Sequence, residues 1–207
     1  MKKKIYSHAG RIGCLLLAVI FAASWPTAAA ASGKSTKKDE TVYVNLNANG
    51  GVQGTTVSDW LHSYSNAVQI ADRSNLSGIQ NVKSAVQPSQ KGDSLTWAMN
   101  GSGSNGSDIY YQGTTRAATP LTVSVSYFLN GKEVTPAQIA GKSGKVKIQV
   151  SLKNTDAHTI RVDGQKTEMY TPMTAVVALT LPSDTFRNVK ISKGKMISDG
   201  NKQFVTF

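Results

Sequence analysis

Two stretches of two-residue alternation constrain this 207-residue chain more than any other feature. In "LTVSVSYFL" (121–129) and "KVKIQVSLK" (145–153), large apolar side chains occupy every second position. Successive side chains of a strand point to opposite faces, so each stretch predicts a strand with one buried and one solvent-exposed face. The Asn-Gly pair at 130–131 predicts a tight turn after the first strand.

Shorter apolar runs between turn signals predict further strands. Residues 41–61 predict a β-hairpin around the turn "NANGG". A short helical turn is expected from Ser74, and the run 173–181, apolar on both faces, predicts a central strand. The other expected strands span 67–72, 94–99, 108–113, 159–164, 165–170, 188–194 and 202–207. Together they predict a mainly β protein of one or two small β modules.

The strands fall into two groups along the chain. Residues 41–113 are expected to form a β-rich module, and residues 114–207 an immunoglobulin-like β-sandwich. Short strands separated by frequent turn signals are typical of such sandwiches.

The first 31 residues have the pattern of a secretory signal peptide. A lysine-rich start is followed by a short apolar run over 12–23, and "TAAAAS" allows cleavage after Ala30 or Ala31. A retained N-terminal anchor is the alternative, although the run is short for a membrane span. We therefore expect an exported protein, extracytoplasmic at the cell surface or secreted. Its polar residues 32–40 are expected to form a disordered leader.

Cysteine usage narrows the chemistry. The only cysteine, Cys14, lies within the predicted signal segment. The exported chain therefore has no disulfide, no cysteine nucleophile and no cysteine-bound zinc.

Charge is unevenly distributed. Residues 32–112 hold six basic and six acidic residues, whereas residues 113–207 hold 13 basic and six acidic ones. Outside a cell, such a surplus attracts anionic wall polymers or lipid headgroups rather than nucleic acid. Lys145 and Lys147 share the predicted solvent face of their strand, and with nearby Lys142 they form a candidate polyanion-binding face. The alternative is a solvated, lysine-rich surface that opposes aggregation.

Two glycine-rich motifs resemble nucleotide-binding loops but lack the required context. "GKS" at 141–143 has Pro136 where a phosphate loop needs its first glycine, and a strand pattern follows where a helix must begin. "GSGSNG" at 101–106 is likewise followed by a strand pattern. We expect no nucleotide partner.

Catalytic and metal-binding patterns are sparse. After the signal segment only His62 and His158 remain as histidines, and they are far apart in sequence, so no metal site and no cofactor are predicted. Asp156 lies close to His158, but no nucleophile motif accompanies them. We therefore predict a non-enzymatic protein with no catalytic residues. An envelope hydrolase acting on wall glycan or peptide is the alternative. A deep cleft holding Asp156 and His158, or two acids about 5 to 9 Å apart, would favour it.

Aromatic residues provide a second candidate contact. Tyr110 and Tyr111 are adjacent on a predicted strand, so they point to opposite faces and only one can belong to the core. The other is a candidate for stacking on sugar or peptide. Trp60 and Trp97 are expected to pack in the core.

Several stretches resemble a known family. "ETVYVNLNANGGVQGTTVSDWL", "LTWAMNGSGSNGSDIYYQGTT", "VSYFLNGKEVTPAQIAGKSGKVKIQVSLKN" and "LPSDTFRNVKISKGKMISDGN" are similar to the N-terminal extracytoplasmic region of large, uncharacterised, membrane-anchored cell-envelope proteins of Firmicutes. The resemblance covers most of the chain from about Glu40 onward. It implies a longer parent, because Phe207 falls within an alternating strand pattern. The family pattern supplies no catalytic residues.

These observations together predict a non-enzymatic, extracytoplasmic binding or spacer module of a cell-envelope protein. Anionic wall polymers, lipid headgroups or another envelope protein are the expected partners.

Overall fold

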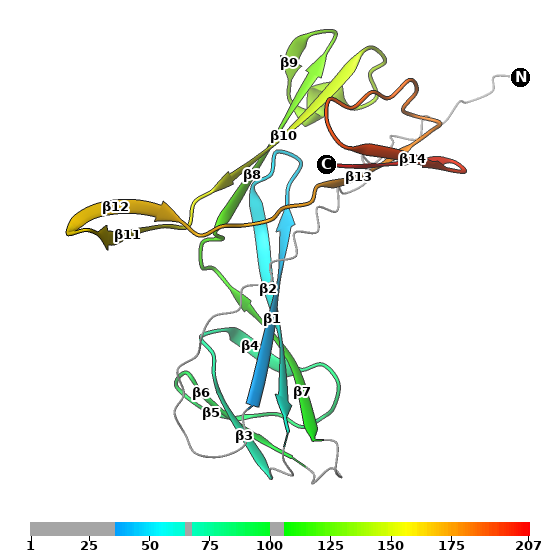
Figure 1. Cartoon of the computed structure of the whole chain (residues 1–207). Helices are drawn as coiled ribbons and strands as arrows, with labels where there is room; N and C mark the ends of the chain where they lie inside the picture. Colours follow the sequence, from blue (N-terminus) through cyan, green and yellow to red (C-terminus); the bar gives the residue numbers. More distant parts are fainter. Residues whose placement is uncertain (1–35, 65–67, 100–105) are drawn as a thin grey trace, which may run out of the picture. The chain divides into compact units, whose positions relative to one another are not determined.

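The computed structural model describes residues 36–64, 68–99 and 106–207 (Figure 1). Of the described residues, 60% lie in strands and only four lie in a helix, so the fold is mainly β, as predicted, with several small antiparallel sheets. The strands are β1 (Thr36–Leu46), β2 (Val52–Ser63), β3 (Gln69–Arg73), β4 (Ser77–Asn81), β5 (Ser89–Lys91), β6 (Ser94–Ala98), β7 (Ser107–Thr115), β8 (Leu121–Leu129), β9 (Lys132–Val134), β10 (Val146–Asn154), β11 (Ala157–Val162), β12 (Gln165–Tyr170), β13 (Ala178–Pro182), β14 (Lys195–Asp199) and β15 (Lys202–Thr206). The predicted signal segment, residues 1–31, lies outside the described residues.

The described chain divides into two compact units. Unit 1 contains residues 46–53 and 118–207, and unit 2 contains residues 36–45 and the described part of 54–117. The β1–β2 hairpin therefore contributes its tip to unit 1 and the rest of its strands to unit 2.

Unit 2 consists of two antiparallel sheets, ordered β1-β2-β7-β4 and β3-β6-β5. Every second residue of β2 is buried, and β7 has the same pattern, so one face of this sheet is a core face. The core residues come from both sheets: Leu61, Ile70, Leu95, Trp97, Ile109 and Tyr111.

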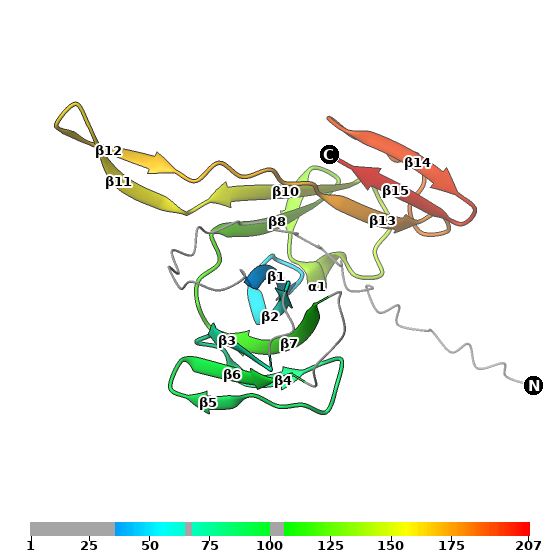
Figure 2. The same cartoon turned by 60° about the horizontal axis from the view of Figure 1, so that its bottom comes forward.

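Unit 1 contains two three-stranded sheets, β10-β8-β9 and β13-β15-β14, and the two-stranded β11–β12 ribbon. The two alternating stretches of the sequence pair with each other as β8 and β10, from Val146 opposite Leu129 to Asn154 opposite Leu121. A core forms against the inner face of β10, where Val150 and Leu152 pack with Val177, which precedes β13, with Leu179 and Leu181 of β13, and with Val205 of β15. Figure 2 shows these two sheets within unit 1.

The tip of the β1–β2 hairpin joins unit 1 by hydrogen bonds to β8. The Tyr127 hydroxyl donates to the Ala48 carbonyl at 2.7 Å, and the Val125 N–H donates to the Asn49 carbonyl at 3.0 Å. Gly50 has φ +92°, and a Cβ at this position would lie 2.3 Å from the Val123 carbonyl oxygen. The "NANGG" turn therefore needs glycine both for its backbone conformation and for this close approach.

Turn chemistry elsewhere follows the prediction. Asn130 and Gly131 both have positive φ, 52° and 86°, and connect β8 to β9 as a hairpin. The helix α1 (Pro136–Ile139) is capped by Thr135, and residues 141–145 then lead into β10 rather than into a helix.

The N-terminal leader was predicted incorrectly for part of its length. Residues 36–40 belong to β1 and are not a disordered leader. They contain no apolar residue, but Lys38 directs its side chain into a polar cluster of unit 2, which holds this segment in place.

Three further element predictions are corrected. Residues after Ser74 form β4, not a helical turn, because pairing with β7 outweighs the local turn preference. The run 173–181 is a strand only from Ala178, and this strand lies at a sheet edge, where Pro182 is tolerated. Residues 188–194 are not a strand, and β14 begins only after Gly194, whose φ is +109°.

None of the helices among the described residues is both long enough and apolar enough to cross a membrane.

Candidate functional site

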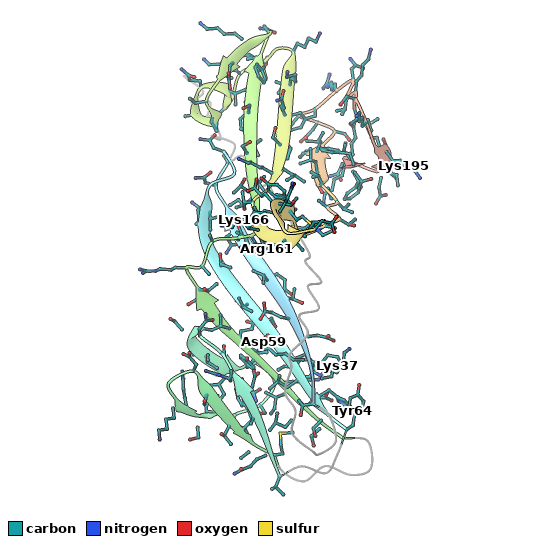
Figure 3. The ribbon with its side chains drawn as sticks, turned by 60° about the vertical axis from the view of Figure 1, so that its left-hand side comes forward. Lys37, Asp59, Tyr64, Arg161, Lys166 and Lys195 are labelled. Atoms are coloured by element: carbon teal, nitrogen blue, oxygen red, sulfur yellow. The ribbon has the colours of Figure 1, made fainter. Side chains whose placement is uncertain are left out.

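A polar cluster is buried between the two sheets of unit 2. Lys38 of β1 places its ammonium 3.1 Å from Asp72 Oδ2 and 3.4 Å from Asp59 Oδ2. The Tyr111 hydroxyl donates to Asp72 Oδ2 at 2.6 Å and accepts from Lys38 Nζ at 3.2 Å. Asp59, labelled in Figure 3, is only 1% exposed. Lys38 therefore forms ion pairs with two carboxylates that come from different sheets.

The environment of Asp59 disfavours its charged form. Burial raises its pKa, and the Lys38 ammonium offsets this only in part. Neither carboxyl oxygen has a well-aligned hydrogen bond among the described residues, since the single phenolic proton of Tyr111 is directed to Asp72. Burial also raises the pKa of Glu40, and the nearby Asp59 charge adds to that increase.

We expect replacement of Asp59 by asparagine to flatten the pH dependence of the stability of unit 2. A carboxyl whose pKa is raised in the folded state binds more protons there than in the unfolded chain. Stability therefore falls as pH rises from the ordinary carboxyl range through the raised pKa. The asparagine has no charge to bury, and Lys38 keeps Asp72 as its partner. At neutral pH the D59N variant should be at least as stable as the parent.

Urea unfolding at pH values from about 4 to 7.5 measures this effect, each pKa unit of elevation corresponding to about 1.4 kcal/mol. Asp108 provides an internal contrast. Burial acts to raise the pKa of Asp108, but hydrogen bonds from His62 and Trp60 lower it overall. The contribution of Asp108 to the stability of unit 2 is therefore lost on acidification. If the stability of D59N and of the parent changed in parallel over this pH range, burial would not raise the pKa of Asp59.

The opposite face of the β2–β7 sheet has a row of aromatic rings. This aromatic row consists of Trp60, His62 and Tyr64 of β2 and its end, and Tyr110 of β7. Trp60 stacks on Tyr110 with centroids 6.1 Å apart, and His62 meets the edge of Tyr64 at 4.4 Å. Asp108 ties the row together, accepting from Trp60 Nε1 at 2.7 Å and lying 2.8 Å from His62 Nδ1.

Two lysines cover the rings of this row. Lys83 Nζ lies 4.0 Å from the centroid of Tyr110, and Lys37 Nζ lies 5.0 Å from that of Trp60. Figure 3 shows Lys37 near the exposed Tyr64. Cations at these distances are attracted to the ring faces, so the row is an ordered amphipathic surface on the face opposite the core.

The two adjacent tyrosines lie on opposite faces, as the alternation requires. Tyr111 is 0% exposed and stacks on Trp97 at 5.1 Å, so it is a core residue and cannot contact a ligand. Tyr110 is partly exposed, and it remains the candidate for aromatic contact. Trp97 is in the core, whereas Trp60 belongs to the aromatic row.

The three predicted polyanion-binding lysines lie in unit 1. Lys142, Lys145 and Lys147 are all exposed, and Lys147 Nζ lies 4.1 Å from the centroid of Phe128 on the neighbouring strand. The exposed face of β10 continues to Lys153. On β8, Phe128 lies opposite Lys147, and the other cross-strand neighbours of this face are small hydroxyl residues: Ser126, Ser124 and Thr122. This face therefore combines cations with hydroxyl groups, both of which can donate hydrogen bonds to an anion.

The two units differ in how their charges are compensated. The described part of unit 2 holds six basic and six acidic residues, with Lys37 and Lys38 in ion pairs. The described part of unit 1 holds 12 Lys and Arg against six Asp and Glu, and none of these lysines or arginines has a carboxylate of the described residues within 4.0 Å. The basic surplus of the described chain is therefore an uncompensated property of unit 1.

Asp156 and His158 meet at the base of the β11–β12 ribbon. Asp156 Oδ1 lies 3.9 Å from His158 Nδ1, and the Thr171 hydroxyl donates to Asp156 Oδ2 at 2.5 Å. Their side chains are 38% and 51% exposed. The backbone N–H of Thr171 also donates to the Asp156 carbonyl, so this group closes the base of the ribbon.

The remaining sequence motifs add no chemistry. Within residues 36–64, 68–99 and 106–207, no three His, Cys, Asp or Glu side chains are placed to hold a metal ion. Most of "GSGSNG" lies outside the described residues.

The polar cluster of Lys38, Asp59, Asp72 and Tyr111, the Lys38 cluster, was not predicted from the sequence. Asp59 nevertheless occupies an inward position between Val57 and Leu61, where a charge is unusual.

Comparison of the chain with protein-family models, with curated proteins and with solved structures found no match.

Proposed function

We propose that the chain is a non-enzymatic, extracytoplasmic binding module of a cell-envelope protein, and that unit 1 associates with anionic polymers or lipid headgroups. The observation that carries this proposal is the set of 12 Lys and Arg side chains in the described part of unit 1, none of which forms an ion pair within the described chain. Uncompensated surface cations attract polyanions over about a Debye length, and each contributes weakly.

The face around β10 gives this attraction a defined location. Lys142, Lys145 and Lys147 are exposed close together in sequence, and the hydroxyl residues of β8 lie beside the strand. Phosphate-rich wall polymers and anionic headgroups present the same chemistry to such a face, namely a negative oxygen with several acceptor positions. We infer that the binding is broad and weak rather than selective for one anion.

The proposal includes export of the chain to the cell surface and an immunoglobulin-like fold for unit 1. The lysine-rich start, apolar run and alanine-rich end of residues 1–31 support export, and the resemblance to Firmicutes envelope proteins supports a cell-surface setting. Two three-stranded antiparallel sheets that pack on a shared core support an immunoglobulin-like sandwich in unit 1.

We expect the triple variant K142Q/K145Q/K147Q to lose binding to polyanions. The assay is pelleting of the chain from residue 32 onward with anionic vesicles, neutral vesicles or isolated anionic wall polymer. At about 1 kcal/mol per lysine near an anionic surface, the apparent affinity should fall by roughly tenfold or more. The two anionic arms distinguish the lipid source of the anion from the polymer source.

The matched control is the triple variant K37Q/K83Q/K91Q, which removes three positive charges from unit 2. This variant should retain most of the binding, because unit 2 is close to neutral. Equal losses in the two variants would mean that net charge alone is responsible and that the β10 face has no special part.

An envelope hydrolase is the alternative function. The raised pKa values of Asp59 and Glu40 favour it, since acid catalysts need carboxyl groups that stay protonated. Against it, Asp59 is 1% exposed, and Asp156 and His158 lie on an open surface. Soluble fragments released from the wall polymer during the pelleting assay would support the hydrolase.

A further inference from the structure

The β11–β12 ribbon is a two-stranded sheet on its own. In Figure 2 it extends beyond the end of β10, and among the described strands β11 and β12 pair only with each other. Every residue of β12 is exposed, including about half of the surface of Met169 and Tyr170. A two-stranded ribbon exposed on both faces is marginally stable in water. This ribbon therefore presents an unpaired edge and uncovered apolar groups.

The charges of the ribbon point to what can cover that edge. Arg161 and Lys166, labelled in Figure 3, lie directly opposite each other, and neither has a carboxylate within 4.0 Å among the residues that the structure describes. Like charges in this position destabilise a strand pair. Over residues 157–170 the ribbon has two basic and two acidic residues, so the whole surplus of unit 1 lies elsewhere. The ribbon is thus a neutral part of a basic unit, where two copies can meet with least repulsion.

The hydrogen-bond phase of β12 follows from the base and the tip of the ribbon. The Thr171 N–H donates to the Asp156 carbonyl at 3.1 Å, and the two-residue turn at Asp163 and Gly164 has positive φ at both positions. Residues 165, 167 and 169 therefore direct their backbone groups toward β11. Residues 166, 168 and 170 direct theirs toward the free edge.

We propose that two copies of the chain associate through antiparallel pairing of β12 with β12 of the second copy, about a two-fold axis at Thr167. In this register Lys166 lies opposite Glu168 of the other copy, and the reverse pair is generated by the symmetry. Each of these two pairs exchanges both backbone hydrogen bonds, because residues 166 and 168 point to the free edge. The result is a four-stranded sheet in which the unpaired Lys166 gains a carboxylate.

Charge selects this register over its neighbours. A two-fold axis at Lys166 would place two lysines opposite each other, and an axis at Glu168 would place two glutamates opposite each other. Only the Thr167 axis makes both pairs opposite in charge. The interface is small, so the dimer is weak and forms at roughly 0.1–1 mM protein.

Sedimentation of the chain from residue 32 onward tests the proposal, with an expected rise toward twice the monomer mass as concentration increases. Lys166→Glu places two glutamates opposite each other and should leave a monomer, and Glu168→Lys should do the same with lysines. The double variant K166E/E168K restores opposite charges and should restore the dimer. Lys166→Glu also gives Arg161 an opposite charge within the ribbon, so its effect is not one of unfolding. The control Lys195→Glu makes the same charge change on β14 and should not alter the mass.

The register has a covalent test, because the chain from residue 32 contains no cysteine. Thr167→Cys places the new thiol opposite its own copy in a non-hydrogen-bonded pair, with Cα atoms about 4.5 Å apart, within reach of a disulfide. Under mild oxidation this variant should form covalent dimers at least tenfold faster than Ser151→Cys on the exposed face of β10. A chain that stays monomeric at every concentration overturns the proposal. So does a dimer that the charge swap does not rescue, or equal cross-linking of the two cysteine variants.

Discussion

Replacement of Lys38 by methionine should destabilise unit 2 by about 3 kcal/mol at neutral pH. The variant removes the cation shared by Asp59 and Asp72 while keeping most of the apolar stem. Removing one partner of a buried ion pair leaves an uncompensated charge, which typically costs about 3–5 kcal/mol. The lower end applies because the Lys38 side chain retains some exposure. The loss should shrink on mild acidification, because burial raises the pKa of Asp59 and this carboxyl then takes up a proton.

Tryptophan fluorescence in a urea titration measures this effect selectively. Beyond residue 35 the only tryptophans are Trp60 and Trp97, and both belong to unit 2. The matched control is Lys37→Met, the neighbouring lysine of the same strand, which pairs with Asp39 at the surface. Its unfolding midpoint should stay close to that of the parent. Equal midpoints for the two variants would show that Lys38 does not neutralise a buried cluster.

Replacement of Trp97 by alanine should destabilise unit 2 by about 3–5 kcal/mol, the range for truncating a large buried aromatic side chain. Trp97 is 0% exposed and stacks on Tyr111 at 5.1 Å in a core built from both sheets. Its indole N–H has no hydrogen-bond partner among the described residues. The loss therefore comes from packing and not from a broken hydrogen bond. Urea unfolding followed by the fluorescence of Trp60 measures it.

Trp60→Ala is the matched control, because it removes the same side chain from the aromatic row. It loses the stack on Tyr110 and the hydrogen bond to Asp108, together worth about 1–2 kcal/mol. Should Trp60→Ala prove as destabilising as Trp97→Ala, the distinction between core face and aromatic row would be wrong.

The strands with one buried face could be predicted from the sequence because alternation records burial directly. The segments 121–129 and 145–153 are strands within one residue of their predicted ends, and they pair with each other. The failures occurred where pairing or a backbone conformation decides the outcome. Residues 77–81 form β4 through β7, and β14 starts where Gly194 allows the chain to turn. Local residue patterns carry little information about such distant partners.

For the candidate sites too, the sequence predicted local features but not contacts between distant residues. The lysines of the β10 face could be predicted because an exposed strand face is a local property. The Lys38 cluster could not, because its members are 34 and 73 residues apart in sequence and meet only when the two sheets pack. Asp59 alone gave a local signal, as a charge at an inward position of β2. Such a signal indicates a buried carboxylate but does not identify its partner.

Pelleting of the chain from residue 32 onward with anionic wall polymer, at rising salt concentration, decides whether unit 1 binds polyanions through its charge. Exposed charges are screened within about 10 Å at 0.1 M salt and about 3 Å at 1 M. Attraction by the unpaired cations of unit 1 therefore predicts that the bound fraction falls steeply between these concentrations. Binding that does not fall as salt rises would contradict the account, because it would require a ligand held by contacts other than charge.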